Sequence, residues 1–243
     1  MNALVEKFRN GPRKALTLMG MSGVGKTHWS WALEKAGWHH YNHDYLIGTK
    51  YLHDELGDSV KTDDLSALSD YVGQVGKGSV GIEEFKRRQA RYIEAERQSL
   101  YDMCGVIDHS PDKFVNDSTG SICEINDEDL FRTVAEHTLF VYIRAGKEEE
   151  QELVAQAFHE PKPLYFQPGQ FDEWLAEFMK QNGHSKIEDF SRDEFSRWVF
   201  PKLFYSRLPK YQRIADKYGV TVSCKELRGL GSVDEFLKVI GFG

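Results

Sequence analysis

The chain has 243 residues, of which 40% are hydrophobic and 28% charged, so it can bury a sizeable core and remain in solution. Its 13% aromatic content excludes a disordered chain, and no apolar run approaches the ~20 residues that a membrane-spanning helix needs. The net charge of −7 disfavours nucleic acid as a partner, and three widely spaced cysteines predict a cytoplasmic protein without a disulfide framework.

Short apolar runs alternate with helical segments along the chain. Strands are predicted over residues 15–19, 38–42, 113–117, 139–143 and 220–224, and helices over 27–36, 82–103 and 147–158. A capping box formed by Ser232 and Glu235 begins a further helix near the C-terminus. This alternation predicts an α/β fold in three layers, with helices on both faces of a parallel sheet of about five strands. The length and this pattern predict a single domain over residues 1–243.

Residues 167–205 interrupt this alternation with a segment rich in aromatic residues. Four apolar residues share the spacing of one helix face, namely Phe171, Trp174, Leu175 and Phe178. A capping box of Ser191 and Glu194 precedes a second aromatic helix. The pattern predicts an inserted helical hairpin. Its aromatic side chains either pack as core or form a lid, a substrate cap or a surface for a protein partner.

The segment between the first strand and the first helix carries the clearest chemical signal. It runs from Gly20 to Thr27 and matches the Walker A pattern GxxxxGK[ST] in full. The glycines let successive backbone N–H groups point at phosphate oxygens, and the helix start adds its positive dipole end. We expect Lys26 to reach the β- and γ-phosphates of a nucleoside triphosphate and the Thr27 hydroxyl to hold Mg²⁺. The candidate nucleotide contacts are Gly20, Ser22, Gly23, Val24, Gly25, Lys26, Thr27 and His28.

Two aspartates lie where parallel strands are predicted to end. Asp44 follows the second strand, where it either accepts a proton from an acceptor hydroxyl or caps the next helix. Asp117 ends the third strand and is our candidate for a second Mg²⁺ ligand, with Asp108 as the alternative. Small residues follow Asp117 in a turn and are candidate substrate contacts, namely Ser118, Thr119 and Gly120.

Four segments together resemble the shikimate kinase group of small P-loop kinases, which are relatives of the nucleoside monophosphate kinases. The first is the phosphate loop. The second is residues 41–45, where Asp44 stands at the position of the family's substrate-binding Asp. The third and fourth are residues 81–87, which resemble the GExxFR motif, and residues 207–216, which resemble the RxPxY…AD motif. Residues 162–165 are similar to the family's RPLL lid motif.

This resemblance implies roles for several cations. Lys86 or Arg87, together with Arg207, would bind an anionic substrate. Lys162 would act as a lid cation that neutralises the transferring phosphate, and Lys225 and Arg228 would lie near adenine.

Several departures from the family's pattern disfavour shikimate itself as the substrate. Asn42 replaces an Asp that helps to organise Mg²⁺, Lys162 replaces the lid Arg, and residues 116–121 replace a glycine-rich substrate loop. The predicted function is an ATP-dependent kinase that phosphorylates a hydroxyl of a small, anionic metabolite. The alternatives are an ATPase or nucleotide-gated switch that binds a protein partner through residues 167–205, and a kinase acting on a macromolecule.

Overall fold

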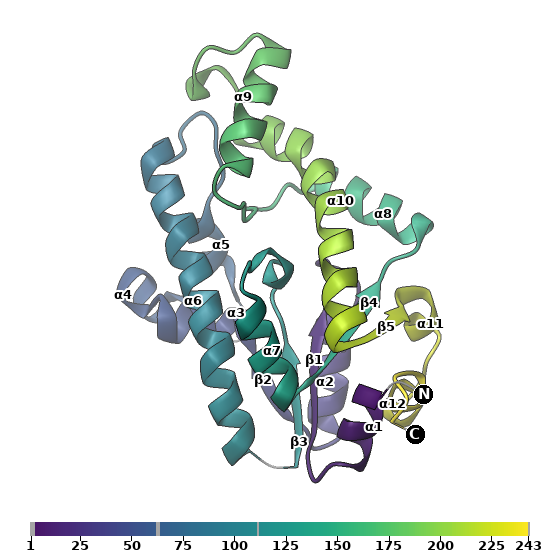
Figure 1. The fold of residues 1–243 in the computed structure, drawn as a ribbon. Helices are drawn as coiled ribbons and strands as arrows, with labels where there is room; N and C mark the ends of the chain where they lie inside the picture. The colour runs from purple at the N-terminus through teal and green to yellow at the C-terminus, as the bar shows by residue number, and fades with distance from the viewer. Residues whose placement is uncertain (1–2, 62–63, 111, 243) are drawn as a thin grey trace. The chain divides into compact units, whose positions relative to one another are not determined.

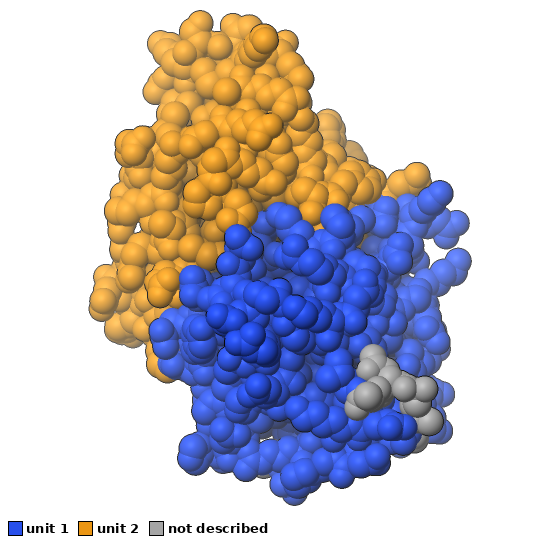
Figure 2. Space-filling view, viewed as in Figure 1, with its two compact units in different colours: residues 1–44, 96–150, 208–243 blue, residues 45–95, 151–207 orange. Residues whose placement is uncertain are grey.

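The computed structural model describes residues 3–61, 64–110 and 112–242. The chain forms two compact units, which Figure 2 colours separately. Unit 1 consists of Met1–Asp44, Glu96–Glu150 and Leu208–Gly243, and unit 2 consists of Tyr45–Ala95 and Gln151–Arg207. Within the described ranges, the helices are too short or too polar to cross a membrane.

Unit 1 is built around one five-stranded sheet (Figure 1). Its strands are β1 (Lys14–Met19), β2 (His39–Asn42), β3 (Lys113–Asp117), β4 (Leu139–Arg144) and β5 (Gly219–Ser223). They lie in the order β2-β3-β1-β4-β5, and every neighbouring pair is parallel. The predicted α/β fold with a parallel sheet of about five strands is therefore confirmed, with each strand within one residue of its expected ends.

Helices cover both faces of this sheet, which explains why its central strands are apolar on both sides. One face carries α1 (Ala3–Asn10), α2 (Lys26–Lys35) and α12 (Val233–Val239), and Trp29 of α2 stacks on Phe236 of α12 with ring centroids 4.7 Å apart. The other face carries α7 (Glu128–His137) and parts of α6 (Ile82–His109) and α10 (Arg192–Tyr218). There Tyr142 of β4 stacks on Tyr211 of α10 at 5.3 Å.

Apart from one isolated β-bridge between Lys61 and Asp64, the regular elements of unit 2 are helices in the part of the chain that the structure describes. The unit contains η1 (Ile47–Tyr51), α4 (His53–Leu56), η2 (Gly57–Ser59), α5 (Ser66–Val72), α9 (Gln170–Asn182), η4 (Ile187–Asp189) and parts of α6, α10 and α8 (Lys147–His159). The aromatic residues of the predicted hairpin form its core, with Phe171, Phe178 and Phe195 only 4%, 3% and 1% exposed. These side chains therefore pack inside the unit.

Two helices, α9 and α10, begin within residues 167–205, and α10 continues past residue 205. The capping box at its start is confirmed, because Ser191 N–H donates to Glu194 Oε2 (2.5 Å) and Glu194 N–H donates to Ser191 Oγ (3.3 Å). Helix α10 then runs to Tyr218 without a break, although Pro201 and Pro209 each remove one backbone donor from it. Its buried residues on both sides of Pro209, such as Leu203 and Tyr211, hold the helix together through packing.

Candidate functional site

The strand order of unit 1 predicts where a ligand binds. The chain runs from β1 to β2 and β3 on one side of β1, and then crosses to β4 and β5 on the other side. In parallel sheets, the point where the order reverses opens a crevice at the carboxyl ends of the strands. The Walker A segment follows β1 directly, so it lies at this switch point.

Three glycines give the phosphate loop its path. Gly20, Gly23 and Gly25 have φ angles of 145°, 90° and 102°, a region that side chains with a Cβ atom rarely enter. At Gly20 a Cβ atom would also lie 2.7 Å from the carbonyl oxygen of Ile143 on β4. The loop thus packs closely against the neighbouring strand before α2 begins at Lys26.

Lys26 is 8% exposed, and its ammonium group lies within the loop, where Nζ donates to the carbonyl oxygens of Gly20 (2.9 Å) and Met21 (3.2 Å). The backbone N–H groups of Ser22, Gly23 and Gly25 donate to no other residue in the described part of the chain. A buried ammonium group and several unpaired amides at a helix start form a donor set that suits phosphate oxygens. The residues present therefore fit a nucleotide phosphate chain, with Thr27 and His28 exposed beside it.

The carboxyl ends of β2 and β3 bring Asp117 close to the phosphate loop. Asp117 ends β3, is 7% exposed, and is in register with Leu18 of β1 and Asn42 of β2. Asp44 lies two residues beyond β2, in the first turn of α3 (His43–Leu46), at the same edge of the sheet. The alternative acid, Asp108, lies inside α6, where its exposed carboxylate is 3.6 Å from Arg13.

The loop after β3 uses its side chains within the fold. Ser118 Oγ donates to the carbonyl oxygen of Leu18 (2.7 Å), while the hydroxyls of Thr119 and Ser121 both donate to Glu96 on α6. Ser118 and Thr119 are 2% and 1% exposed. Substrate contacts by Ser118 and Thr119 remain predictions. In this structure both hydroxyl groups donate hydrogen bonds to protein atoms.

Sequence reasoning missed two buried polar residues beside this loop. Glu96 is fully buried, although its place in a densely charged helical segment gave no sign of that. His43 is also fully buried, and neither ring nitrogen has a hydrogen-bond partner among the described residues. Loss of solvent lowers the pKa of His43 to about 4. The backbone of Glu96 raises this pKa, but its effect is smaller than that of burial. The only available signal for His43 was its position directly before Asp44.

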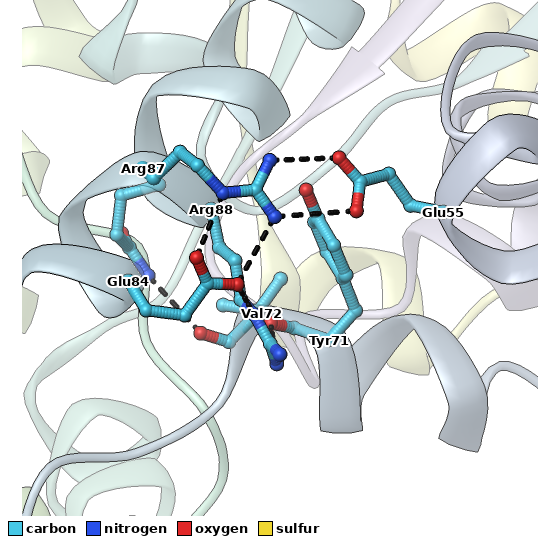
Figure 3. Close-up of polar contacts among 7 residues, drawn as sticks. Glu55, Tyr71, Val72, Glu84, Arg87 and Arg88 are labelled. Atoms are coloured by element: carbon cyan, nitrogen blue, oxygen red, sulfur yellow. Dashed lines mark hydrogen bonds and ion pairs between the residues drawn. The ribbon is translucent and has the colours of Figure 1, made fainter. Parts of the chain in front are cut away.

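The substrate-binding cations expected from residues 81–87 have partners within unit 2. Lys86 Nζ lies 2.6 Å from Asp172 Oδ1. Figure 3 shows the Arg87 guanidinium between Glu55 and Glu84, with one contact of 2.8 Å to each carboxylate. Hydrogen bonds from Arg87 and Arg88 lower the pKa of Glu84 to about 2. An anionic ligand at Lys86 or Arg87 would therefore compete with carboxylates already in place.

The remaining expected residues lie in varied surroundings. Arg207 is 5% exposed, and its Nη2 donates to the carbonyl oxygen of Tyr165 (2.9 Å), within unit 2. Lys162 is exposed. Lys225 and Arg228 are both exposed on α11 (Cys224–Arg228), where Lys225 Nζ is 3.7 Å from Glu148.

Comparison with known proteins gave matches among solved structures alone. No protein-family model matches the chain, and neither does any curated protein. The chain is similar to a shikimate kinase from Acinetobacter baumannii in complex with shikimate, at 13% identity and a TM-score of 0.42 over 97% of this chain and 96% of that one. It is also similar to a shikimate kinase from Bacteroides thetaiotaomicron, at 14% identity and a TM-score of 0.37 over 79% and 98%. A sugar kinase from a Janibacter species matches at 11% identity and a TM-score of 0.38 over 95% and 96%.

Proposed function

We propose that this chain binds ATP at its phosphate loop and transfers the γ-phosphate to a hydroxyl group of a small, anionic molecule. The observation that carries the proposal is the position of the Lys26 ammonium group. It is buried at the switch point of the sheet and donates hydrogen bonds to the carbonyl oxygens of Gly20 and Met21. Phosphate oxygens would compete with these two carbonyl oxygens for the same donor. A complete Walker A sequence in its strand, loop and helix context adds to this support.

Each proposed role follows from what phosphoryl transfer requires, which is charge stabilisation and alignment. Lys26 and the loop amides would bind the β- and γ-phosphates. Thr27 and Asp117 would hold Mg²⁺, which neutralises phosphate charge when it is bound. Lys162 would supply a further cation.

Asp44 would orient the acceptor hydroxyl and accept its proton. The acceptor oxygen then forms a bond to the γ-phosphorus as the bond to the ADP oxygen breaks. The products are a phosphate ester and ADP. An anionic group on the acceptor would be bound by Arg207 and by Lys86 or Arg87. Lys225 and Arg228 would contact the base of the nucleotide.

Thermal-shift titrations with ATP and ADP, each with and without Mg²⁺, test nucleotide binding directly. A ligand that binds only the native state stabilises it by about 2.7 kcal/mol at a concentration 100 times its Kd. We expect ATP to raise the melting temperature of the parent chain and to raise that of Lys26→Ala much less. The matched control is Lys35→Ala, because Lys35 is an exposed lysine on the same helix. Equal shifts for Lys26→Ala and the parent would refute a role of the loop in binding.

ATP consumption in the presence of a panel of hydroxylated metabolites then tests the transfer step. A kinase should hydrolyse ATP slowly alone and faster with its acceptor, and a labelled γ-phosphate should appear on that acceptor. Binding of ATP followed by release of inorganic phosphate alone, with every metabolite tested, would favour an ATPase.

A further inference from the structure

The buried carboxyl group of Glu96 organises the loop that follows β3. Glu96 lies on α6 and is 0% exposed. Its Oε1 atom accepts hydrogen bonds from the hydroxyls of Thr119 and Ser121, the latter at 2.8 Å. Thr119 Oγ1 in turn accepts from the backbone N–H of Ser121 (3.3 Å). A carboxyl group removed from water is costly, and these donors offset part of that cost.

Two further hydrogen bonds restrain the same loop from other elements. The Tyr211 hydroxyl on α10 donates to the carbonyl oxygen of Gly120 (2.5 Å), and Ser118 Oγ donates to Leu18 O on β1 (2.7 Å). Residues 118–121 are therefore held from α6, α10 and the central strand together. Such a loop has little freedom to move independently of the sheet.

The restrained loop lies directly against the phosphate loop. A Cβ atom built on Gly120 would be 3.7 Å from the backbone nitrogen of Ser22, one of the amides without an intramolecular acceptor. Residues 118–121 consequently lie next to that amide. A shift of about 1 Å in a supporting element can cost a bound complex its alignment.

We propose that Glu96 is a positioning residue that holds residues 118–121 against the phosphate loop and thereby fixes the geometry in which that loop receives phosphate. Glu96 acts through Thr119 and Ser121, whose hydroxyl groups link it to the loop, so it touches neither nucleotide nor acceptor. The part of the proposal that concerns phosphate rests on the function proposed above, whereas the coupling between the two loops does not.

Hydrogen exchange of the full chain without any ligand tests the coupling. The double variant Thr119→Val/Ser121→Ala removes both donors to Glu96 and keeps the side chains close to their original size. The matched control is Thr138→Val, because Thr138 is fully buried and its hydroxyl lies 3.2 Å from that of Thr17, away from these loops. We expect the protected amides within residues 20–26, such as that of Val24, which donates to the carbonyl oxygen of Met21, to exchange roughly tenfold faster in the double variant and at the parent's rate in the control. Equal exchange of residues 20–26 in the parent, the double variant and the control would overturn the proposal.

ATP affinity and a conservative variant provide the second readout. We expect the double variant to raise the Kd for ATP by roughly tenfold, while Thr138→Val leaves it unchanged. In the parent chain, Glu96→Gln keeps an oxygen acceptor for both hydroxyls, so we expect its exchange rates and its Kd for ATP to stay near those of the parent. Glu96→Leu removes that acceptor and should change both values in the same direction as the double variant. A parent chain that binds no ATP would refute the proposed function alone, because the exchange experiment still decides whether Glu96 couples the loops. An unchanged ATP affinity in the double variant would refute the role in phosphate binding.

Discussion

The buried His43 predicts a specific pH dependence of stability. Its ring is fully buried, lacks a hydrogen-bond partner among the described residues, and has a pKa of about 4 against an ordinary value of 6.5. In the unfolded chain the ring regains solvent and its ordinary pKa. The unfolded state therefore binds one more proton than the folded state between about pH 4 and pH 6.5. The contribution of His43 to stability is complete above pH 6.5 and is lost as the pH falls toward 4.

The magnitude follows from the two pKa values. Protonation of the unfolded state alone should lower the free energy of unfolding by about 2 kcal/mol between pH 7.5 and pH 5. The total loss below both pKa values is about 3 kcal/mol. Since a domain is stable by only about 5–15 kcal/mol, this loss is measurable in urea.

The perturbation is His43→Phe, which keeps an aromatic ring near Tyr41 and removes the titrating group. Phe is larger than His, so the variant differs from the parent by a packing term, but that term does not depend on pH. Urea unfolding at pH 5 and pH 7.5 should show that the variant loses about 2 kcal/mol less stability on acidification than the parent.

The matched control is His53→Phe, because it makes the same substitution at an exposed histidine. It should retain the pH dependence of the parent. An identical loss of stability in His43→Phe and the parent would show that the ring of His43 is not desolvated, and would refute the reasoning.

Three further predictions concern positions where the geometry is specific. Gly20→Ala should destabilise the protein by at least about 2 kcal/mol in urea unfolding, because of its positive φ and the 2.7 Å approach to Ile143 O, and an unchanged midpoint would contradict this. Gly120→Ala should leave stability nearly unchanged but weaken ATP binding in a thermal-shift titration, because its methyl group would lie 3.7 Å from Ser22 N. Lys210→Met should lower the free energy of unfolding by about 3 kcal/mol, because its partner Glu124, 2.5 Å away, has a fully buried side chain. Lys225→Met removes an exposed pair with Glu148 and should lower the free energy of unfolding by under about 1 kcal/mol.

The sequence predicted the sheet and the phosphate loop because both are encoded locally. A strand buried on both faces requires a continuous apolar run, such as the one that ends at Met19 before the loop. The glycine spacing of the loop is a direct consequence of its backbone angles, so Gly20, Gly23 and Gly25 could be identified without coordinates. The capping box at Ser191 was visible for the same reason.

The continuation of α10 past residue 205 was not predictable in this way. Proline is a strong local signal against a helix interior, yet Pro209 lies within α10. Burial of residues on both sides of it outweighs the lost donor, and such burial depends on the sheet and on helices far away in the sequence.

What only the tertiary structure decided is the environment of the charged and polar side chains. Glu96 and Arg87 belong to the same charged helix, yet Glu96 is fully buried against residues 118–121, while Arg87 pairs with carboxylates at the surface of unit 2. A helix of uniform charge pattern does not reveal which of its faces another element will cover. The sequence by itself determined where phosphate can bind, because that depends on a short run of backbone angles. The structure determined what holds that loop in place, because those contacts join residues that are distant along the chain.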